Sequence, residues 1–118
     1  MSVISDLVAT PGVIAAGEYT YRGDRFTYEG QLDQETARMA SIMCRATTMA
    51  VHMETDMLKN LEADCGCAPA RGWVVKGDNF TVCVVANVFC FLDNNSSSLN
   101  EIMAYMREHV PGPEEMLV

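Results

Sequence analysis

Hydrophobic and polar positions divide the first quarter of the chain into a short helix and a hairpin. Apolar residues recur at helical spacing over residues 3–8, and a Pro-Gly pair stops that segment. Residues 13–21 are rich in β-branched and aromatic side chains, and residues 25–29 alternate between apolar and polar. A turn that contains Gly23 and Asp24 separates the two runs. This pattern predicts one helix followed by a β-hairpin.

Residues 33–61 contain neither proline nor glycine, and we expect them to form one long helix. Asp33 is suited to cap its N-terminus. On a helical wheel, one side of this helix is rich in methionine. We call it the methionine face, and it consists of Met39, Ile42, Met43, Ala46, Met49, Ala50, Met53 and Met57. It is the side that we expect to pack on the sheet as core.

A second apolar strip lies beside the methionine face on the same helix. This small-residue strip consists of Ala37, Ala40, Cys44, Val51 and Leu58. A monomer needs only one apolar side on such a helix, and small residues allow another surface to approach closely. The strip therefore suggests a partner surface, although the alternative that it is merely half-exposed stays open.

Three apolar runs and an amphipathic segment follow a loop rich in glycine and proline. The runs span residues 73–75, 80–85 and 88–92, and turn residues separate them. Ser98 and Glu101 form a capping box at the start of the last segment. Its apolar stripe consists of Leu99, Ile102, Met103, Met106 and Val110. We expect three strands and a terminal helix.

The expected element order is α-ββ-α-βββ-α, which is typical of an α+β domain. We predict a five-stranded, mainly antiparallel sheet, with the long helix on one face and the two shorter helices on the other. The length of 118 residues suits a single domain with its own core. We expect this domain to span residues 1–110 and residues 111–118 to form a mobile tail.

Charge narrows the classes of partner. Sixteen acidic and eight basic residues give a net charge of −8 at pH 7, so most of the surface would repel a phosphate backbone or an anionic membrane. The N-terminal segment has no signature of an export signal, and five cysteines without one favour a reducing cytoplasm. We expect a cytoplasmic protein that neither binds nucleic acid nor inserts into a membrane.

Candidate chemistry centres on the thiols of Cys65 and Cys67 in the loop. Two thiols this close suit a soft metal, redox chemistry or sulfur transfer. Zinc, however, requires about four ligands, and no second pair occurs at zinc-finger spacing. Cys44, Cys83 and Cys90 lie in apolar segments and are expected to be buried. No catalytic constellation or phosphate-binding loop is present, so we expect no enzyme activity and no cofactor.

The element order resembles the roadblock (dynein light chain) domain. The likeness includes the junction from Leu7 through the Pro-Gly pair to Val13, the hairpin around Gly23 and Asp24, and the long helix between the second and third strands. It extends over residues 3–110. The chain is most similar to an uncharacterised prokaryotic branch of that family.

The resemblance implies a homodimer in which two long helices pack side by side and two third strands meet edge to edge. An unpaired edge strand is an aggregation hazard that such pairing removes. On this chain the interface would consist of the small-residue strip and the third strand: Ala37, Ala40, Cys44, Val51, Leu58, Trp73, Val74 and Val75. The resemblance also implies a scaffold or regulator for a small Ras-like GTPase or a multiprotein assembly.

Two further hypotheses stay open beside this one. The first is a redox, sulfur-carrier or metal-binding protein that uses Cys65 and Cys67. The second is a profilin-like sensor of small molecules with a pocket lined by methionines.

Overall fold

The structure is a computed structural model that describes residues 2–62 and 71–110. Within these residues, three helices and five strands follow one another in the predicted order α-ββ-α-βββ-α. The expected α+β class is therefore confirmed. The bounds are α1 Val3–Ala9, β1 Val13–Tyr19, β2 Phe26–Gly30, α2 Gln34–Leu61, β3 Gly72–Lys76, β4 Phe80–Val85, β5 Val88–Asp93 and α3 Leu99–His109.

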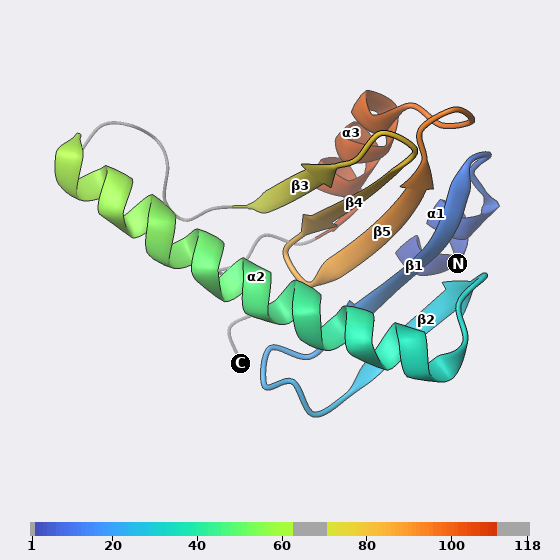
Figure 1. The fold of residues 1–118 in the computed structure, drawn as a ribbon, viewed down its shortest axis with the longest axis horizontal. Helices are drawn as coiled ribbons and strands as arrows, with labels where there is room; N and C mark the ends of the chain where they lie inside the picture. Colours follow the sequence, from blue (N-terminus) through green and yellow to red (C-terminus); the bar gives the residue numbers. More distant parts are fainter. Residues whose placement is uncertain (1, 63–70, 111–118) are drawn as a thin grey trace.

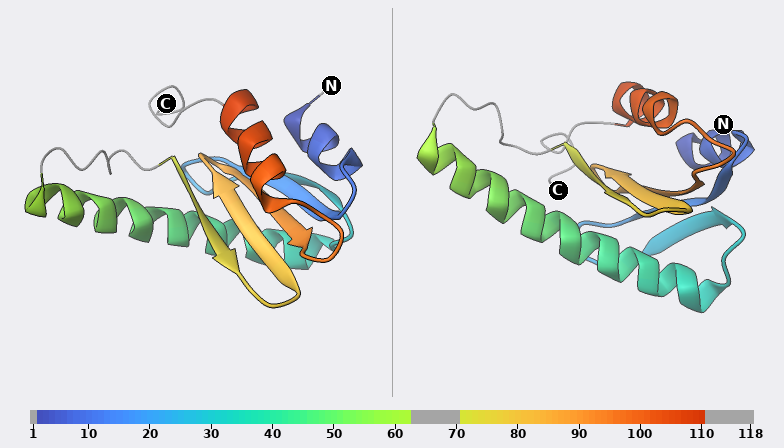
Figure 2. Two further views of the ribbon diagram at one scale, coloured as in Figure 1. Left: turned by 90° about the horizontal axis from the view of Figure 1, so that it is seen from above. Right: turned by 45° about the horizontal axis from the view of Figure 1, so that its top comes forward.

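The five strands form one sheet in the order β2-β1-β5-β4-β3, and every pairing is antiparallel. The sheet therefore has two edge strands, β2 and β3. Helices α1 and α3 lie on one face of the sheet and α2 runs obliquely across the other, as Figures 1 and 2 show. No helix in the described part of the chain combines the length and hydropathy needed to cross a bilayer.

Two apolar clusters hold these layers together. On the side of α1 and α3, Leu7, Leu92 and Met106 are buried. In the expected stripe of α3, Ile102 and Val110 are also buried, whereas Leu99 and Met103 are half-buried. On the side of α2, the large rings of Tyr19 and Phe89 fill the space above the sheet, and Trp73 packs beside them. Cys83 and Cys90 face each other across β4 and β5 in the first cluster, so their predicted burial is confirmed.

Hydrogen-bonded caps fix where the helices begin. The Asp33 carboxylate accepts the backbone N–H of Thr36 at 2.7 Å, and this bond lowers the pKa of Asp33. The Ser98 hydroxyl accepts the N–H of Glu101 at the start of α3. Both residues occupy the cap positions that the sequence predicts.

Candidate functional site

The methionine face of α2 points away from the sheet. Its larger side chains, from Met39 to Met57, have exposed fractions between 44% and 71%. The prediction that this face is core is therefore wrong. Exposed apolar side chains in this number on one side of a surface helix are uncommon for a monomer, so this face is the candidate interaction site.

The opposite side of α2 carries small residues and packs on the sheet. Ala37, Ser41, Cys44 and Thr48 are all buried there. The prediction that Ala37 and Cys44 belong to an intersubunit surface is thus corrected, since both are enclosed within one chain. Among the other members of the small-residue strip, Ala40 and Val51 are half-buried and Leu58 is exposed.

The size of the side chains on the sheet explains this orientation. Tyr19, Trp73 and Phe89 rise from the α2 side of β1, β3 and β5. At Gly17 the ring of Phe89 comes so close that an added Cβ would lie 2.4 Å from its Cζ. A helix over such large rings approaches closely only if its own residues are small, as close packing requires.

A buried hydrogen-bond network joins α2 to the sheet at Thr48. The Thr48 hydroxyl donates to the carbonyl oxygen of Cys44 at 2.8 Å, and it accepts the Trp73 indole N–H at 2.8 Å. Because its single proton is used, the Tyr19 hydroxyl, 3.0 Å away, is the donor to its second lone pair. Burial raises the pKa of Tyr19 to about 12.

The C-terminal half of α2 extends beyond the sheet. Figures 1 and 2 show this half of α2 running past the end of the edge strand β3. No residue of α2 after Thr48 is buried, and the exposed residues there include Met53, Met57, Leu58 and Leu61. Beyond Thr48, this half of the helix therefore has several exposed apolar side chains and no buried one.

Strand β3 is a free edge next to this overhang. Within residues 2–62 and 71–110 it pairs only with β4, so one row of its backbone N–H and C=O groups has no strand partner there. Trp73 is half-buried under α2, whereas Val74 and Val75 are exposed. Phe80 at the start of β4 is also exposed, at 60%. Val75 and Phe80 lie on the α2 side of the sheet, because side chains alternate along each strand from Trp73 and Val82.

The hydrophobic pattern of the sequence does not identify Thr48 or Phe80 as residues of the candidate site. The alternation of large rings on one side of three strands is the signal that would have indicated which side of α2 faces inward. The sequence predicts Phe80 only as a strand residue, because the hydrophobic pattern does not distinguish an exposed apolar residue at the end of a hairpin from a buried one.

The thiol hypothesis rests on residues outside the described part of the chain. Cys65 and Cys67 lie between residues 62 and 71, so their predicted role stays a prediction. Burial raises the pKa of Cys44 to about 12, which keeps that thiol protonated near neutral pH. Within residues 2–62 and 71–110, no group of three or more His, Cys, Asp or Glu side chains is placed to hold a metal ion.

Comparison with known protein families identifies the chain over almost its whole length. Residues 3–108 match the model of DUF2173, a family described as uncharacterized conserved proteins. The chain belongs to the DUF2173 family. A search of curated proteins finds no match to this DUF2173 member.

Solved structures show which fold this DUF2173 chain has. It is similar to a Roadblock/LC7 domain from Streptomyces avermitilis, with a TM-score of 0.64 and 18% identity over 91% of this chain and 88% of that one. It is also similar to MglB from Myxococcus xanthus, with a TM-score of 0.63 and 11% identity over 82% of this chain and 76% of that one. The predicted resemblance to the roadblock domain is thus confirmed at the level of the fold.

Proposed function

We propose that this protein is a non-enzymatic, homodimeric interaction module of the cytoplasm that serves as a scaffold or regulator for another protein. The observation that carries the proposal is the exposed methionine face of α2. Apolar surface of this extent is expected to bind protein, because its burial removes many methyl and thioether groups from water. Methionine side chains also adapt their shape to more than one partner surface.

The first partner is a second copy of the chain. Edge pairing of two β3 strands would continue the sheet and satisfy the free backbone groups of that edge. In such a two-fold arrangement, the overhanging half of α2 from one copy would lie over the sheet of the other. Val75 and Phe80 are the exposed apolar residues on that side of the sheet. Each copy thus offers an uncovered helix and an uncovered patch of sheet, as a symmetric interface requires.

This arrangement changes the predicted interface. Val51, Leu58, Trp73, Val74 and Val75 stay in it as part of the overhang and the β3 edge. Ala40 is at its margin. Ala37 and Cys44 leave it because they are buried against their own sheet. Met43 and Leu61 replace them, since both are exposed on the side of α2 that Leu58 shares.

The second partner is a different protein that docks on the paired α2 helices. The part of the methionine face directly opposite the sheet would stay open after two helices pack side by side. The roadblock fold and the likeness to MglB favour a small Ras-like GTPase as that partner. A multiprotein assembly that uses the same platform is the alternative.

Sedimentation velocity of the wild-type chain tests the dimer. We expect a species of twice the chain mass at low micromolar concentration, and a shift towards monomer after Val75→Glu, which places like charges at the paired edges. Asn100→Glu on α3, an exposed position on the other side of the sheet, is the matched control and should leave the dimer unchanged. A wild-type monomer at every concentration would overturn this part of the proposal.

Binding of purified Ras-like GTPases from the host organism tests the second partner. Isothermal titration calorimetry is done with each GTPase loaded with GDP or with a non-hydrolysable GTP analogue. We expect one of them to bind, with affinity that depends on the nucleotide and falls after Met49→Glu on the outward side of α2. If no GTPase binds in either state, the GTPase part of the proposal is wrong while the dimer can still stand.

A further inference from the structure

Half of the basic residues of this acidic chain belong to two segments of the fold. Four of the eight, Arg22, Arg25, Arg38 and Arg45, belong to the β1–β2 turn or to the N-terminal half of α2. In residues 2–62 and 71–110 one ion pair forms, between Arg38 and Glu35. The other three arginines have no carboxylate partner there, although acidic residues outnumber basic ones two to one.

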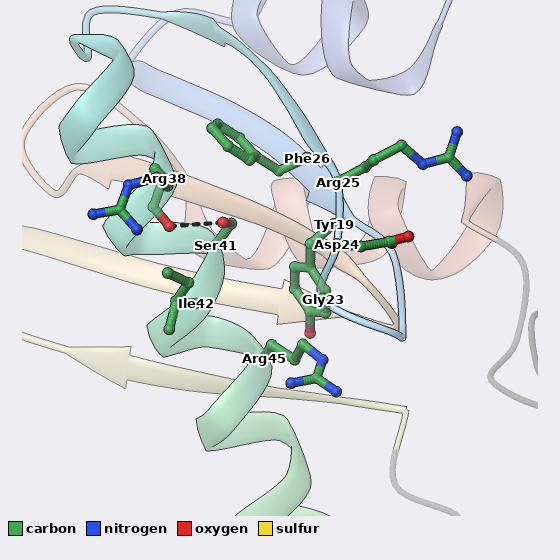
Figure 3. Close-up of a pocket in the computed structure, with 9 residues that line it drawn as sticks. All are labelled: Tyr19, Gly23, Asp24, Arg25, Phe26, Arg38, Ser41, Ile42 and Arg45. Atoms are coloured by element: carbon green, nitrogen blue, oxygen red, sulfur yellow. Dashed lines mark hydrogen bonds between the residues drawn. The ribbon is translucent and has the colours of Figure 1, made fainter.

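Three of these arginines line a pocket between the turn and α2. The pocket has a volume of about 220 Å³, and its polar wall includes Arg25, Arg38 and Arg45 (Figure 3). Phe26 and Ile42 give it an apolar wall. The pocket is below the usual size range for drug-sized ligands, so it suits a molecule of about one ring.

Arg45 is the fixed cation of this pocket. Its Nε donates to the carbonyl oxygen of Tyr21 at 2.8 Å, and its terminal amino groups make no hydrogen bond within the described residues. The turn approaches Arg45 closely at Gly23, which has a φ of +81° in the left-handed region and where an added Cβ would lie 3.0 Å from Cζ of Arg45. The backbone therefore holds the guanidinium in place and leaves its donors free for a ligand.

Arg25 and Arg38 lie at the rim of the pocket. Figure 3 shows their guanidinium groups pointing away from each other. The pair between Arg38 and Glu35 is largely exposed, with side-chain exposures of 47% and 70%, and an exposed pair of this kind is easily exchanged for a better acceptor. The side chains of Arg25 and Arg38 would each turn inward to contact an anion bound at Arg45.

One acidic residue, Asp24, also lines the pocket. Its carboxylate accepts the Thr20 hydroxyl at 2.6 Å, and that bond lowers the pKa of Asp24. The carboxylate is therefore occupied within its own turn. Three arginines against one aspartate leave the pocket positive, in a chain whose total charge is −8.

We propose that this pocket binds a small organic anion. Its phosphate or carboxylate group would bind Arg45 and the rim arginines, because a guanidinium donates two parallel hydrogen bonds to such groups. Its apolar body would pack on Phe26 and Ile42. This site is separate from the proposed β3 edge pairing and does not depend on it.

Isothermal titration calorimetry at constant ionic strength tests the site with three probes: phenyl phosphate, benzoate and inorganic phosphate. We expect phenyl phosphate or benzoate to bind more tightly than inorganic phosphate, and the tighter of the two identifies the acidic group. Arg45→Gln should weaken that binding at least about tenfold, since hydrogen bonds to charged groups are strong. Arg107→Gln on α3, at an exposed position on the opposite side of the sheet, should leave it unchanged.

Arg25→Gln is the second variant, because this exposed side chain makes no hydrogen bond that the fold needs within the described residues. We expect it to weaken binding several-fold with an unchanged circular dichroism spectrum. The proposal is wrong if none of the three probes binds the wild type, or if both variants bind as tightly as the wild type. Equal affinity for phenyl phosphate and inorganic phosphate would overturn the apolar part of the site. Sedimentation of the same variants reports the dimer independently.

Discussion

The exposure of the two sides of α2 is the reverse of what their hydrophobicity suggests. The outward side carries methionines and is exposed, whereas the inward side carries Ala37, Ser41, Cys44 and Thr48 and is buried. The more apolar side of the helix is thus not the side that packs on its own sheet. Tyr19, Trp73 and Phe89 supply the bulk of the contact from the sheet, so the helix supplies small residues and one hydroxyl.

This comparison teaches that the burial of a helix side depends on the surface it meets. A hydrophobic stripe measures how much a side gains by leaving water. It does not tell whether that surface is the chain's own sheet or another molecule. In this chain one side of α2 packs on its own sheet and the opposite side is exposed. Substitutions on each side distinguish these two roles.

The largest difference is expected when an alanine is replaced by arginine on each side of α2. Ala37→Arg puts an unpaired charge and a long side chain at a position with no exposed surface. Its cost should approach the whole stability of a small domain, about 5–15 kcal/mol, so the variant is expected not to fold. Ala46→Arg, on the exposed methionine face, should keep the wild-type circular dichroism spectrum. An unfolded Ala46→Arg beside a folded Ala37→Arg would reverse the assignment of the two sides.

A second contrast compares methionines in two places. Met106→Ala empties space in the core under α3 and should lower the free energy of unfolding by about 2–5 kcal/mol. Met53→Ala, at an exposed position, should change the free energy of unfolding of the monomer by no more than about 0.5 kcal/mol. Urea denaturation at a concentration where the chain is monomeric measures both. Equal losses would indicate that Met53 is also in a core.

The polar contact on the inward side gives a smaller effect. Thr48→Val keeps the shape of the side chain but leaves the Trp73 indole N–H and the Tyr19 hydroxyl without their acceptor. The expected loss is about 1–3 kcal/mol, and it should be visible in the fluorescence of Trp73, the single tryptophan. Thr47→Val, one position away and without such bonds, is the control. A Thr48→Val protein as stable as its control would show that the network contributes nothing.

The smallest effect is expected in the pH dependence of stability. Burial raises the pKa of Tyr19 to about 12, above its value of about 10 in the unfolded chain. Between these values the folded chain holds more protons than the unfolded chain, so stability falls as pH rises through this window. Below about pH 10 the contribution of Tyr19 is fully present. Tyr19→Phe should flatten this alkaline decline, and an unchanged slope would contradict the burial of the Tyr19 hydroxyl.

The elements of the fold were predictable because each has a local cause. Asp33 and Ser98 cap their helices, and Pro11 follows the end of α1. Alternation along β2 and the apolar run of β5 reflect how many faces of each strand are covered. These signals act within a few residues, so the sequence alone carries them.

The candidate surface was only partly predictable. The pattern indicated two apolar sides of α2, and the family resemblance implied that Trp73, Val74 and Val75 form a sheet edge. Neither could assign the sides of the helix. That assignment depends on contacts between residues far apart in the chain, such as Thr48 with Trp73 and Tyr19. The pocket at Arg45 was not foreseen for the same reason, because Gly23 and Arg45 meet only in the folded chain.

The most direct test is sedimentation of the double variant Met43→Glu, Leu61→Glu beside the wild type. Both positions are exposed on the side of α2 that is proposed to pack in the dimer. We expect the wild type to sediment at twice the chain mass and the variant to be a folded monomer with an unchanged circular dichroism spectrum. A variant that stays dimeric, or that unfolds at every concentration, would contradict the account.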